Sequence, residues 1–246
     1  MIPLHPPRAL LVDVGLTLVH PNGRTMLAEL QRDLPLALLA PEDMVATLIL
    51  AAEARHLPYP DGDGDARVIA TWGMLLGLSG DAARRLWRRT IARPDLYDGL
   101  DPDAVALLAG LRARGVRVAA VSNSDGTLEA ELDRFGLLDS FDVVVDSTAA
   151  GLEKPQPGIY AAACAALSLP PAECWFLGDG LVNDVIAPQG AGIALGVLYD
   201  RFGLYRHLAG IVRVARLGEV LELVDCATRA PNGAPRRLEG CGDAGR

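Results

Sequence analysis

Lysine is almost absent from this chain of 246 residues. Its 23 basic side chains are all arginines except one, Lys154. A guanidinium is a planar fork, whereas an ammonium is a compact point charge that can contact a carboxylate and a phosphoryl oxygen together. A single retained lysine can arise by chance, but it also suits a position where only the smaller cation fits.

Cysteine pairs and long apolar runs are missing as well. The four cysteines show no Cys-x-x-Cys spacing, which argues against a zinc site or a redox pair. No apolar run reaches the roughly 18 residues that span a membrane. The opening residues, MIPLHPP, lack the charged start and the long apolar core of a signal peptide. We therefore expect a cytoplasmic protein without a membrane partner.

The charge balance is acidic, with a formal net charge of −8 and a pI near 5.0. Domains that bind nucleic acids usually carry a basic face, so we expect no nucleic-acid partner. Half of the residues are hydrophobic and 22% are charged. At this length, such a composition is typical of a globular protein with one large core, or with a core and a smaller module.

Three segments share one pattern, in which an apolar run ends at a polar residue and a turn. They are residues 9–18, 116–126 and 174–184, with Asp13, Ser122 and Asp179 at the ends of the runs. Such runs predict buried parallel strands, and open parallel sheets bind ligands outside the carboxyl ends of their strands. Each polar residue also suits a simple turn or helix cap. Together with Lys154, which precedes a later helix, they favour one shared site.

The order of four motifs resembles the haloacid dehalogenase (HAD) superfamily of aspartyl-nucleophile hydrolases. Members carry Asp-x-Asp-x-Thr-Leu after the first strand, Ser or Thr after a second strand, a Lys-Pro-x-Pro loop, and then Gly-Asp-x-x-x-Asn-Asp. This chain reads DVGLTL at 13–18, SN at 122–123, KPQP at 154–157 and GDGLVND at 178–184. The resemblance extends over about residues 8–225.

The resemblance implies a metal site and a nucleophile. Asp13 matches the nucleophile, which forms an aspartyl-phosphate. The carboxylates of Asp13 and Asp179 and the backbone carbonyl of Gly15 would bind Mg²⁺, an ion that takes oxygen ligands and is held by carboxylates and phosphate. Asp184 would lie nearby as a further carboxylate of the metal site.

The resemblance also implies roles for four other residues. Ser122 would donate a hydrogen bond to a phosphoryl oxygen. Lys154 would balance the charge on the nucleophile and the transferred group, an electrostatic role that is often the largest in catalysis. Thr17 and Asn123, in the first two motifs, are expected to contact the substrate.

The first motif departs from the family pattern. Gly15 stands where phosphatases of the family have a second Asp, the general acid and base, whose loss costs about 10²–10⁴-fold in rate. Leu16 replaces a usual Gly. Three explanations are open: the leaving group needs little protonation, another residue such as Asp125 supplies the proton, or the protein is a weak enzyme. Asp125 also belongs to an Asp-Gly turn signal, which is the more common role for such a pair.

The coarse pattern predicts a HAD-like α/β core, a Rossmann-like parallel sheet, with an inserted α-helical cap. Strands and helices alternate in residues 1–19 and 98–225, which form the expected core. Apolar residues at three- and four-residue spacing predict only helices in residues 20–97, the expected cap. Residues 226–246 are rich in Pro, Gly and Arg and are expected to be a disordered tail.

The leading functional hypothesis is a Mg²⁺-dependent phosphatase of a small phosphorylated metabolite. A 2-haloacid dehalogenase is one alternative, because a halide needs no proton to leave. A catalytically weak binding protein that keeps the fold is the other, because Gly15 replaces the general acid. Phosphonate cleavage needs a cap lysine, and residues 20–97 contain none. The sequence names neither the substrate nor the oligomeric state.

Overall fold

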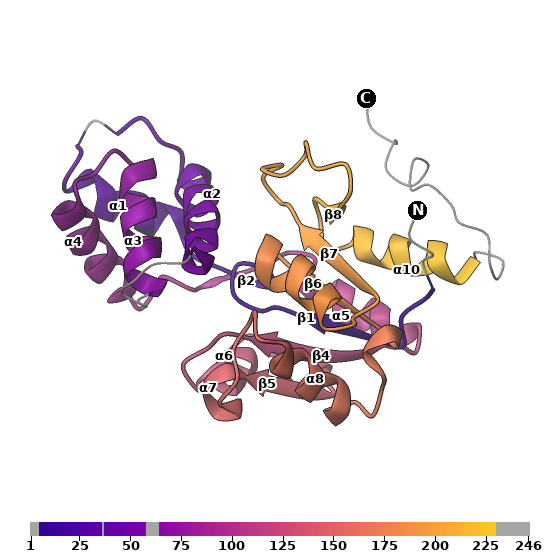
Figure 1. Cartoon of the computed structure of the whole chain (residues 1–246). Helices are drawn as coiled ribbons and strands as arrows, with labels where there is room; N and C mark the ends of the chain where they lie inside the picture. Colours follow the sequence, from indigo (N-terminus) through magenta and orange to yellow (C-terminus); the bar gives the residue numbers. More distant parts are fainter. Residues whose placement is uncertain (1–4, 36, 58–63, 230–246) are drawn as a thin grey trace. The chain divides into compact units, whose positions relative to one another are not determined.

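The computed structural model describes residues 5–35, 37–57 and 64–229, and Figure 1 shows their arrangement. The described residues divide into two compact units. We call residues 5–14, 102–179 and 183–229 the α/β unit, and residues 15–101 together with 180–182 the helical unit.

A six-stranded sheet runs through the α/β unit, and all of its strand pairs are parallel. In spatial order the strands are β5 (Val143–Asp146), β4 (Arg117–Ser122), β1 (Ala9–Val12), β6 (Cys174–Gly178), β7 (Leu195–Tyr199) and β8 (Val212–Val214). β1 lies between β4 and β6, and its four residues are fully buried. A continuous apolar run is what a strand covered on both faces requires.

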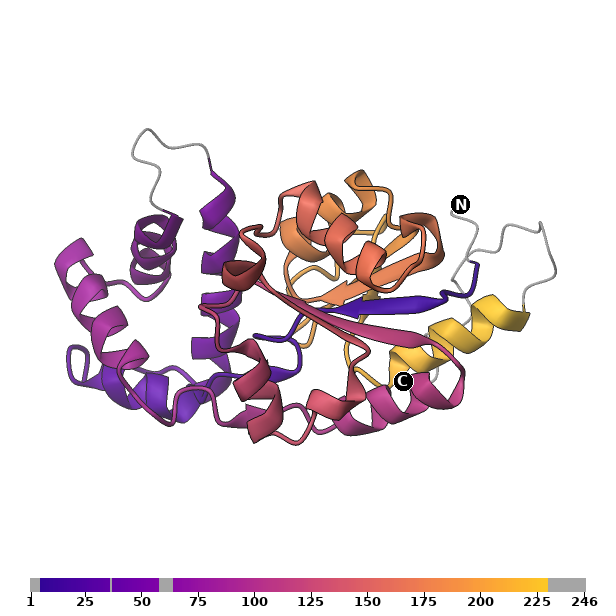
Figure 2. The same cartoon turned by 90° about the horizontal axis from the view of Figure 1, so that it is seen from below.

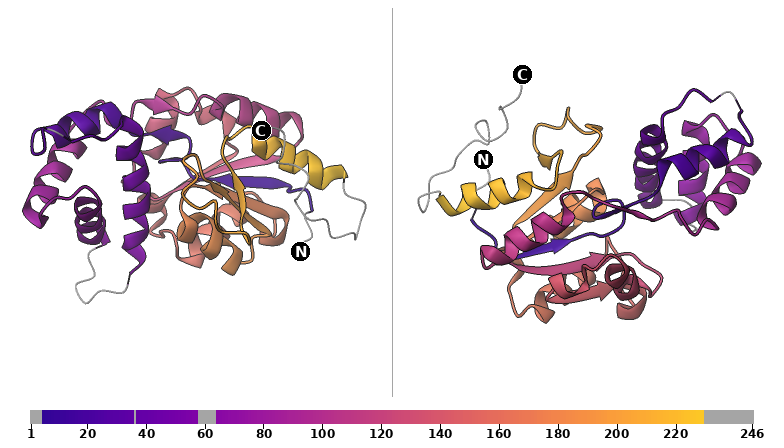
Figure 3. Two further views of the ribbon diagram at one scale, coloured as in Figure 1. Left: turned by 90° about the horizontal axis from the view of Figure 1, so that it is seen from above. Right: turned by 180° about the vertical axis from the view of Figure 1, so that it is seen from behind.

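Helices cover both faces of this sheet. Figures 2 and 3 show α5 (Ala104–Ala113) and α10 (Glu219–Arg229) on one face and α8 (Pro157–Ala166) on the other. The shorter helical segments of the unit are α6 (Leu128–Arg134), η2 (Leu138–Ser140), α7 (Ser147–Ala150), η3 (Pro171–Glu173) and α9 (Ala187–Gly190). The three-layer arrangement confirms the predicted HAD-like α/β fold class.

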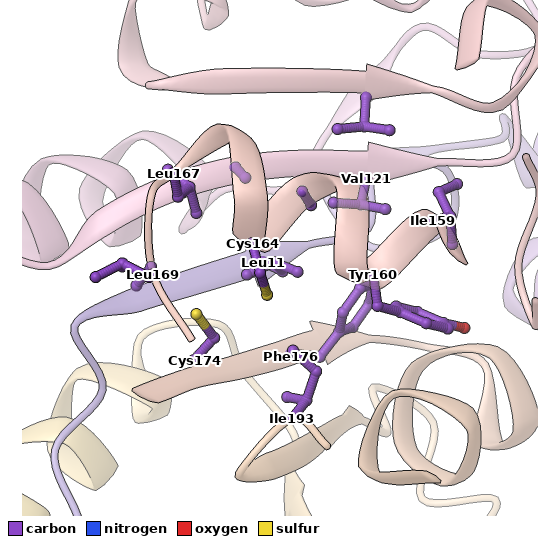
Figure 4. Close-up of a cluster of buried hydrophobic side chains, with 14 residues drawn as sticks. Leu11, Val121, Ile159, Tyr160, Cys164, Leu167, Leu169, Cys174, Phe176 and Ile193 are labelled. Atoms are coloured by element: carbon purple, nitrogen blue, oxygen red, sulfur yellow. The ribbon is translucent and has the colours of Figure 1, made fainter. Parts of the chain in front are cut away.

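The core on the α8 side joins one helix to four strands (Figure 4). α8 has Pro at its start and is rich in alanine, and both features suit a helix. It buries Ile159, Tyr160, Ala163 and Cys164 against Leu11, Val121 and Phe176 of the sheet, among others. Burying one large apolar side chain contributes about 1.5–3 kcal/mol, so this cluster holds the helix firmly on the strands that carry the site.

The described part of the helical unit contains four α-helices and one short antiparallel pair of strands. Its elements are β2 (Val19–His20), α1 (Gly23–Gln31), α2 (Pro41–Ala52), η1 (Glu53–His56), α3 (Gly64–Leu75), α4 (Gly80–Ile91) and β3 (Gly99–Leu100). Trp72 is fully buried and meets Trp87 edge to face, with ring centroids 6.0 Å apart. Both tryptophans are therefore packing residues of this unit.

Several elements differ from the sequence predictions. The β2–β3 pair and the edge strand β8 have only two or three residues each, too few for a readable periodicity. A π-helix, η4 (Leu181–Ile186), follows β6 where strand–helix alternation predicts an α-helix, and α9 follows with Pro188 in its first turn, where proline is tolerated.

The predicted tail at 226–246 begins too early, because α10 continues to Arg229. Val220, Leu223, Val224 and Ala227 are buried on this helix, so its apolar spacing runs past residue 226. The rest of that prediction lies outside the described residues. Among the described residues, no helix has the length and apolar character to cross a membrane.

Candidate active site

Three adjacent strands place polar side chains at one edge of the sheet. Asp13 follows β1, Ser122 ends β4 and Asp179 follows β6. In the parallel register, Val12 is paired with Ala120 of β4 and with Leu177 of β6. The three carboxyl ends therefore lie side by side, where open parallel sheets bind ligands. Asp13, Ser122 and Asp179 are each buried, so their polar groups are shielded from bulk water.

Lys154 lies within this group and is 3% exposed. Its Nζ is 2.7 Å from Oδ1 of Asp13 and 2.8 Å from Oδ1 of Asp184. Burial alone would lower the pKa of Lys154, but attraction to these two carboxylates outweighs it and raises the pKa above its ordinary value. The side chain therefore remains an ammonium. The Phe176 ring lies beneath it, 5.3 Å from Nζ to the ring centroid, which is cation–π range.

Asp13 is held by two groups. Ser122 Oγ donates a 3.0 Å hydrogen bond to Oδ1, the same oxygen that contacts Lys154. Among the described residues, the side-chain contacts of Asp13 fall on Oδ1, so they orient the carboxylate without engaging Oδ2.

The loop that carries Lys154 is tied to the segment that follows β4. The backbone N–H of Lys154 donates to Oδ1 of Asn123 at 2.8 Å, and Nδ2 of Asn123 donates to the Lys154 carbonyl at 2.9 Å. The Lys154–Pro155 peptide bond is cis. Asn123 thus positions the loop through both of its polar atoms. Its expected contact with the substrate remains a prediction.

Three carboxylates in this group can hold a metal ion. Oxygens of Asp13, Asp179 and Asp184 come within 4.8 Å of one another, and all three residues are buried. Three carboxylates carry three negative charges, and Lys154 supplies one positive charge, so a dication would balance the set. Oxygen donors are also the ligands that Mg²⁺ prefers. The donor set and its charge therefore fit Mg²⁺.

Gly15 and Thr17 belong to the helical unit, and their expected roles at the site stay predictions. Leu16, between them, has φ of 63° and donates from its N–H to the Val19 carbonyl at 2.7 Å. Leu16 therefore adopts the left-handed backbone conformation that usually favours glycine. A Cβ built on Gly15 meets nothing within 4 Å, and Thr17 is fully buried.

Asp125 has the structural role that its turn signal indicates. Its Oδ1 accepts hydrogen bonds from Thr127 N–H at 3.3 Å and from Thr127 Oγ1 at 2.6 Å. This is an Asx turn at the start of α6. The side chain is exposed, so the structure favours the turn interpretation over the general-acid interpretation.

Two further residues, Asp146 and Tyr160, make hydrogen bonds next to the site and were not predicted from the sequence. Asp146 ends β5 and accepts hydrogen bonds from the N–H groups of Leu128, Thr148 and Ala149. Burial works against its charged form, but the hydrogen bonds outweigh that effect and lower the pKa of Asp146. A helix-capping pattern, Asp followed by Ser and Thr, is the signal that points to it. The other residue is Tyr160 on α8, whose hydroxyl donates to the Asn183 carbonyl at 2.6 Å.

A family model for haloacid dehalogenase-like hydrolases matches residues 9–192. The chain belongs to this hydrolase family. Membership of a hydrolase family is what the four motifs predicted.

Two relatives illustrate the range of similarity within the family. Human haloacid dehalogenase-like hydrolase domain-containing protein 3 is 38% identical over 105 residues, which cover 43% of this chain and 41% of that protein. The chain thus spans less than half the length of this curated relative. Phosphoglycolate phosphatase of Rhodospirillum rubrum is 30% identical over 201 residues, which cover 78% of this chain and 79% of that protein.

Solved structures of the family share the fold. The HAD-hydrolase YfnB from Bacillus subtilis, solved bound to magnesium, has a TM-score of 0.62 at 19% identity. The match covers 89% of this chain and 99% of that chain. At this identity the likeness shows the fold alone.

Proposed function

We propose that this HAD-like hydrolase is a Mg²⁺-dependent phosphatase that acts on a small phosphorylated metabolite through an aspartyl-phosphate on Asp13. The observation that supports it best is the group of buried Asp13, Asp179 and Asp184 oxygens beside the Lys154 ammonium. Similarity to a phosphoglycolate phosphatase over 78% of the chain supports the same chemistry.

In the proposed reaction, an Asp13 carboxylate oxygen attacks phosphorus and the bond from phosphorus to the ester oxygen breaks. The leaving oxygen departs with the bonding pair. Water then attacks the aspartyl-phosphate, which releases phosphate and restores the carboxylate. Ser122 and Lys154 orient Asp13 through Oδ1, and Lys154 also offsets negative charge. Mg²⁺, when bound, would neutralise charge on the phosphoryl oxygens.

The leaving oxygen needs a proton unless it is a stable anion. Gly15 has no side chain that could supply one, and Asp125 is occupied in its turn with Thr127. We therefore propose that the preferred substrates have good leaving groups, such as aryl or acyl phosphates. General acids contribute about 10²–10⁴-fold, so simple alkyl phosphates should be slower by a factor of that order.

We also propose that residues 20–97 act as the cap that selects the substrate. Apart from His20 at the end of β2, the regular elements in the described part of this span are helices, and every strand of the six-stranded sheet lies outside it. A small phosphorylated molecule as the partner fits the proposed reaction. The cytoplasmic location stays a prediction from the sequence.

The test is a panel of aryl, acyl and alkyl phosphates and 2-haloacids, each assayed with Mg²⁺ and with a chelator. We expect phosphate release from the aryl and acyl compounds that stops when the metal is removed. Asp13→Asn serves as the inactive control, because the amide is a poor nucleophile. Metal-independent halide release would instead support the dehalogenase alternative, and no turnover with retained Mg²⁺ binding would support the weak binding protein.

A further inference from the structure

Tyr160 contacts the backbone next to the candidate metal site. Its hydroxyl donates a 2.6 Å hydrogen bond to the carbonyl of Asn183, the residue directly before Asp184. We propose that Tyr160 is a positioning residue, which holds this backbone so that Asp184 meets Lys154 and the other two carboxylates. The inference rests on the proposed function, because it treats Asp184 as part of the metal site.

Packing alone does not require this hydroxyl. Tyr160 is fully buried among the apolar side chains of the α8 cluster, where a phenylalanine would fill the same space. A buried hydroxyl without a partner is unfavourable, so a tyrosine at such a position needs a defined acceptor. The acceptor here is a carbonyl of η4, the π-helix that carries Asp184. Single π-turns of this kind occur often at functional sites.

The Tyr160 ring is connected to the site by a second contact. It meets Phe176 edge to face, with ring centroids 5.5 Å apart and an interplanar angle of 81° (Figure 4). Phe176 in turn lies beneath the Lys154 ammonium. Lys154 is paired with Asp184 at 2.8 Å. Tyr160 thus supports both partners of this ion pair, Lys154 through the Phe176 ring and Asp184 through the peptide bond from Asn183.

The protonation state suits a hydrogen-bond donor. Burial raises the pKa of the Tyr160 phenol, and the nearby carboxylates of Asp184 and Asp13 raise it further, against an opposing effect of Lys154. The phenol therefore stays protonated at neutral pH and can donate to a carbonyl.

Tyr160→Phe in the full chain removes the hydroxyl and keeps the ring. We expect the Kd for Mg²⁺, measured by titration calorimetry, to rise about tenfold, the lower end of what loss of a group that orients metal ligands costs. The matched control is Thr228→Val, which removes a hydrogen bond to the Val224 carbonyl in α10. The control should leave the Kd unchanged.

A second readout needs no metal. Because Lys154 is the only lysine, lysine labelled with ¹⁵N gives one side-chain ammonium signal in an NMR spectrum. We expect its proton exchange with water to quicken in Tyr160→Phe by up to about tenfold, which corresponds to about 1.4 kcal/mol, within the range for loss of one hydrogen bond. Thr228→Val should not change that rate.

The two readouts separate the possible failures. If wild-type protein binds no Mg²⁺, the proposed function fails, while the exchange rate in metal-free protein still decides the role of Tyr160. If Tyr160→Phe changes neither the Mg²⁺ affinity nor the Lys154 exchange rate, Tyr160 is a packing residue and the inference is wrong. A fall in Tm without either change leads to the same conclusion.

Discussion

Asn123 holds the backbone of Lys154 at both its N–H and its carbonyl group. The two hydrogen bonds measure 2.8 and 2.9 Å and join residues 31 positions apart in the chain. They connect the end of β4 to the loop that delivers the single lysine. The placement of the ammonium beside Asp13 therefore depends on a neutral amide as well as on charge.

We expect Asn123→Ala to reduce catalysis by displacing Lys154 from Asp13. The lost hydrogen bonds should also lower the free energy of unfolding by roughly 1–3 kcal/mol. The measurements are kcat/KM for an aryl phosphate and urea unfolding. Asn123→Asp keeps an acceptor but loses the donor, so it should fall between wild type and Asn123→Ala. Unchanged kinetics in Asn123→Ala would show that the loop is held by other contacts.

We expect Lys154→Arg to lower kcat/KM by on the order of 10²–10³-fold, as loss of one well-placed electrostatic group does. The site is closed around a compact ammonium with two contacts under 3 Å, and a planar guanidinium cannot reproduce that geometry. Arg85→Lys on the exposed side of α4 is the matched control and should be neutral. Full activity in Lys154→Arg would contradict the requirement for a compact cation.

We expect Gly15→Asp to raise the turnover of alkyl phosphates by a factor toward the roughly 10²–10⁴ range of general acids. The new Cβ meets nothing within 4 Å, so the side chain can be accommodated. The gain should be smaller for aryl phosphates, whose leaving groups need less protonation. Gly15→Asn has a similar size but cannot donate the proton as an acid, so it should show no gain. Equal alkyl-phosphate turnover in wild type and Gly15→Asp would mean that another residue already supplies the proton.

We expect Asp146 to contribute stability that depends on pH. Its pKa in the folded protein lies below the ordinary value of 3.8. Its contribution should therefore be complete above that value and be lost as the pH falls through the folded pKa. Asp146→Ala should lower the free energy of unfolding by roughly 1–2 kcal/mol at pH 7, as loss of an N-cap side chain does. Urea unfolding at several pH values checks this, and a difference that does not shrink as the pH falls below 3.8 would refute it.

Local sequence patterns were sufficient to predict the strand ends of the site. The apolar runs before Asp13, Ser122 and Asp179 predict parallel strands, and parallel strands bring their carboxyl ends to one edge. The helices of the α/β unit follow from the same alternation. The nearness of Lys154 to Asp13 was expected from the family resemblance, and the structure places their side chains 2.7 Å apart.

Contacts between distant segments could not be read from the sequence. The Asn123–Lys154 hydrogen bonds, the bond from Tyr160 to Asn183 and the pairing of β7 with β8 each join residues whose separation in the chain carries no periodic signal. The motif suggested a contact of Asn123 with the substrate, which stays a prediction, but it gave no sign that the amide is bonded to the backbone of Lys154.

The physical division lies between local preference and packing. Strand and helix formation depends on apolar spacing, turns and caps, which neighbouring residues encode. A buried donor or acceptor must find a hydrogen-bond partner. The direction of a polar side chain therefore depends on which polar groups lie near it once the core has packed. The sequence alone therefore determined which strands carry the chemistry of this hydrolase. The tertiary structure decided which side chains hold Asp13, Lys154 and Asp184 in place.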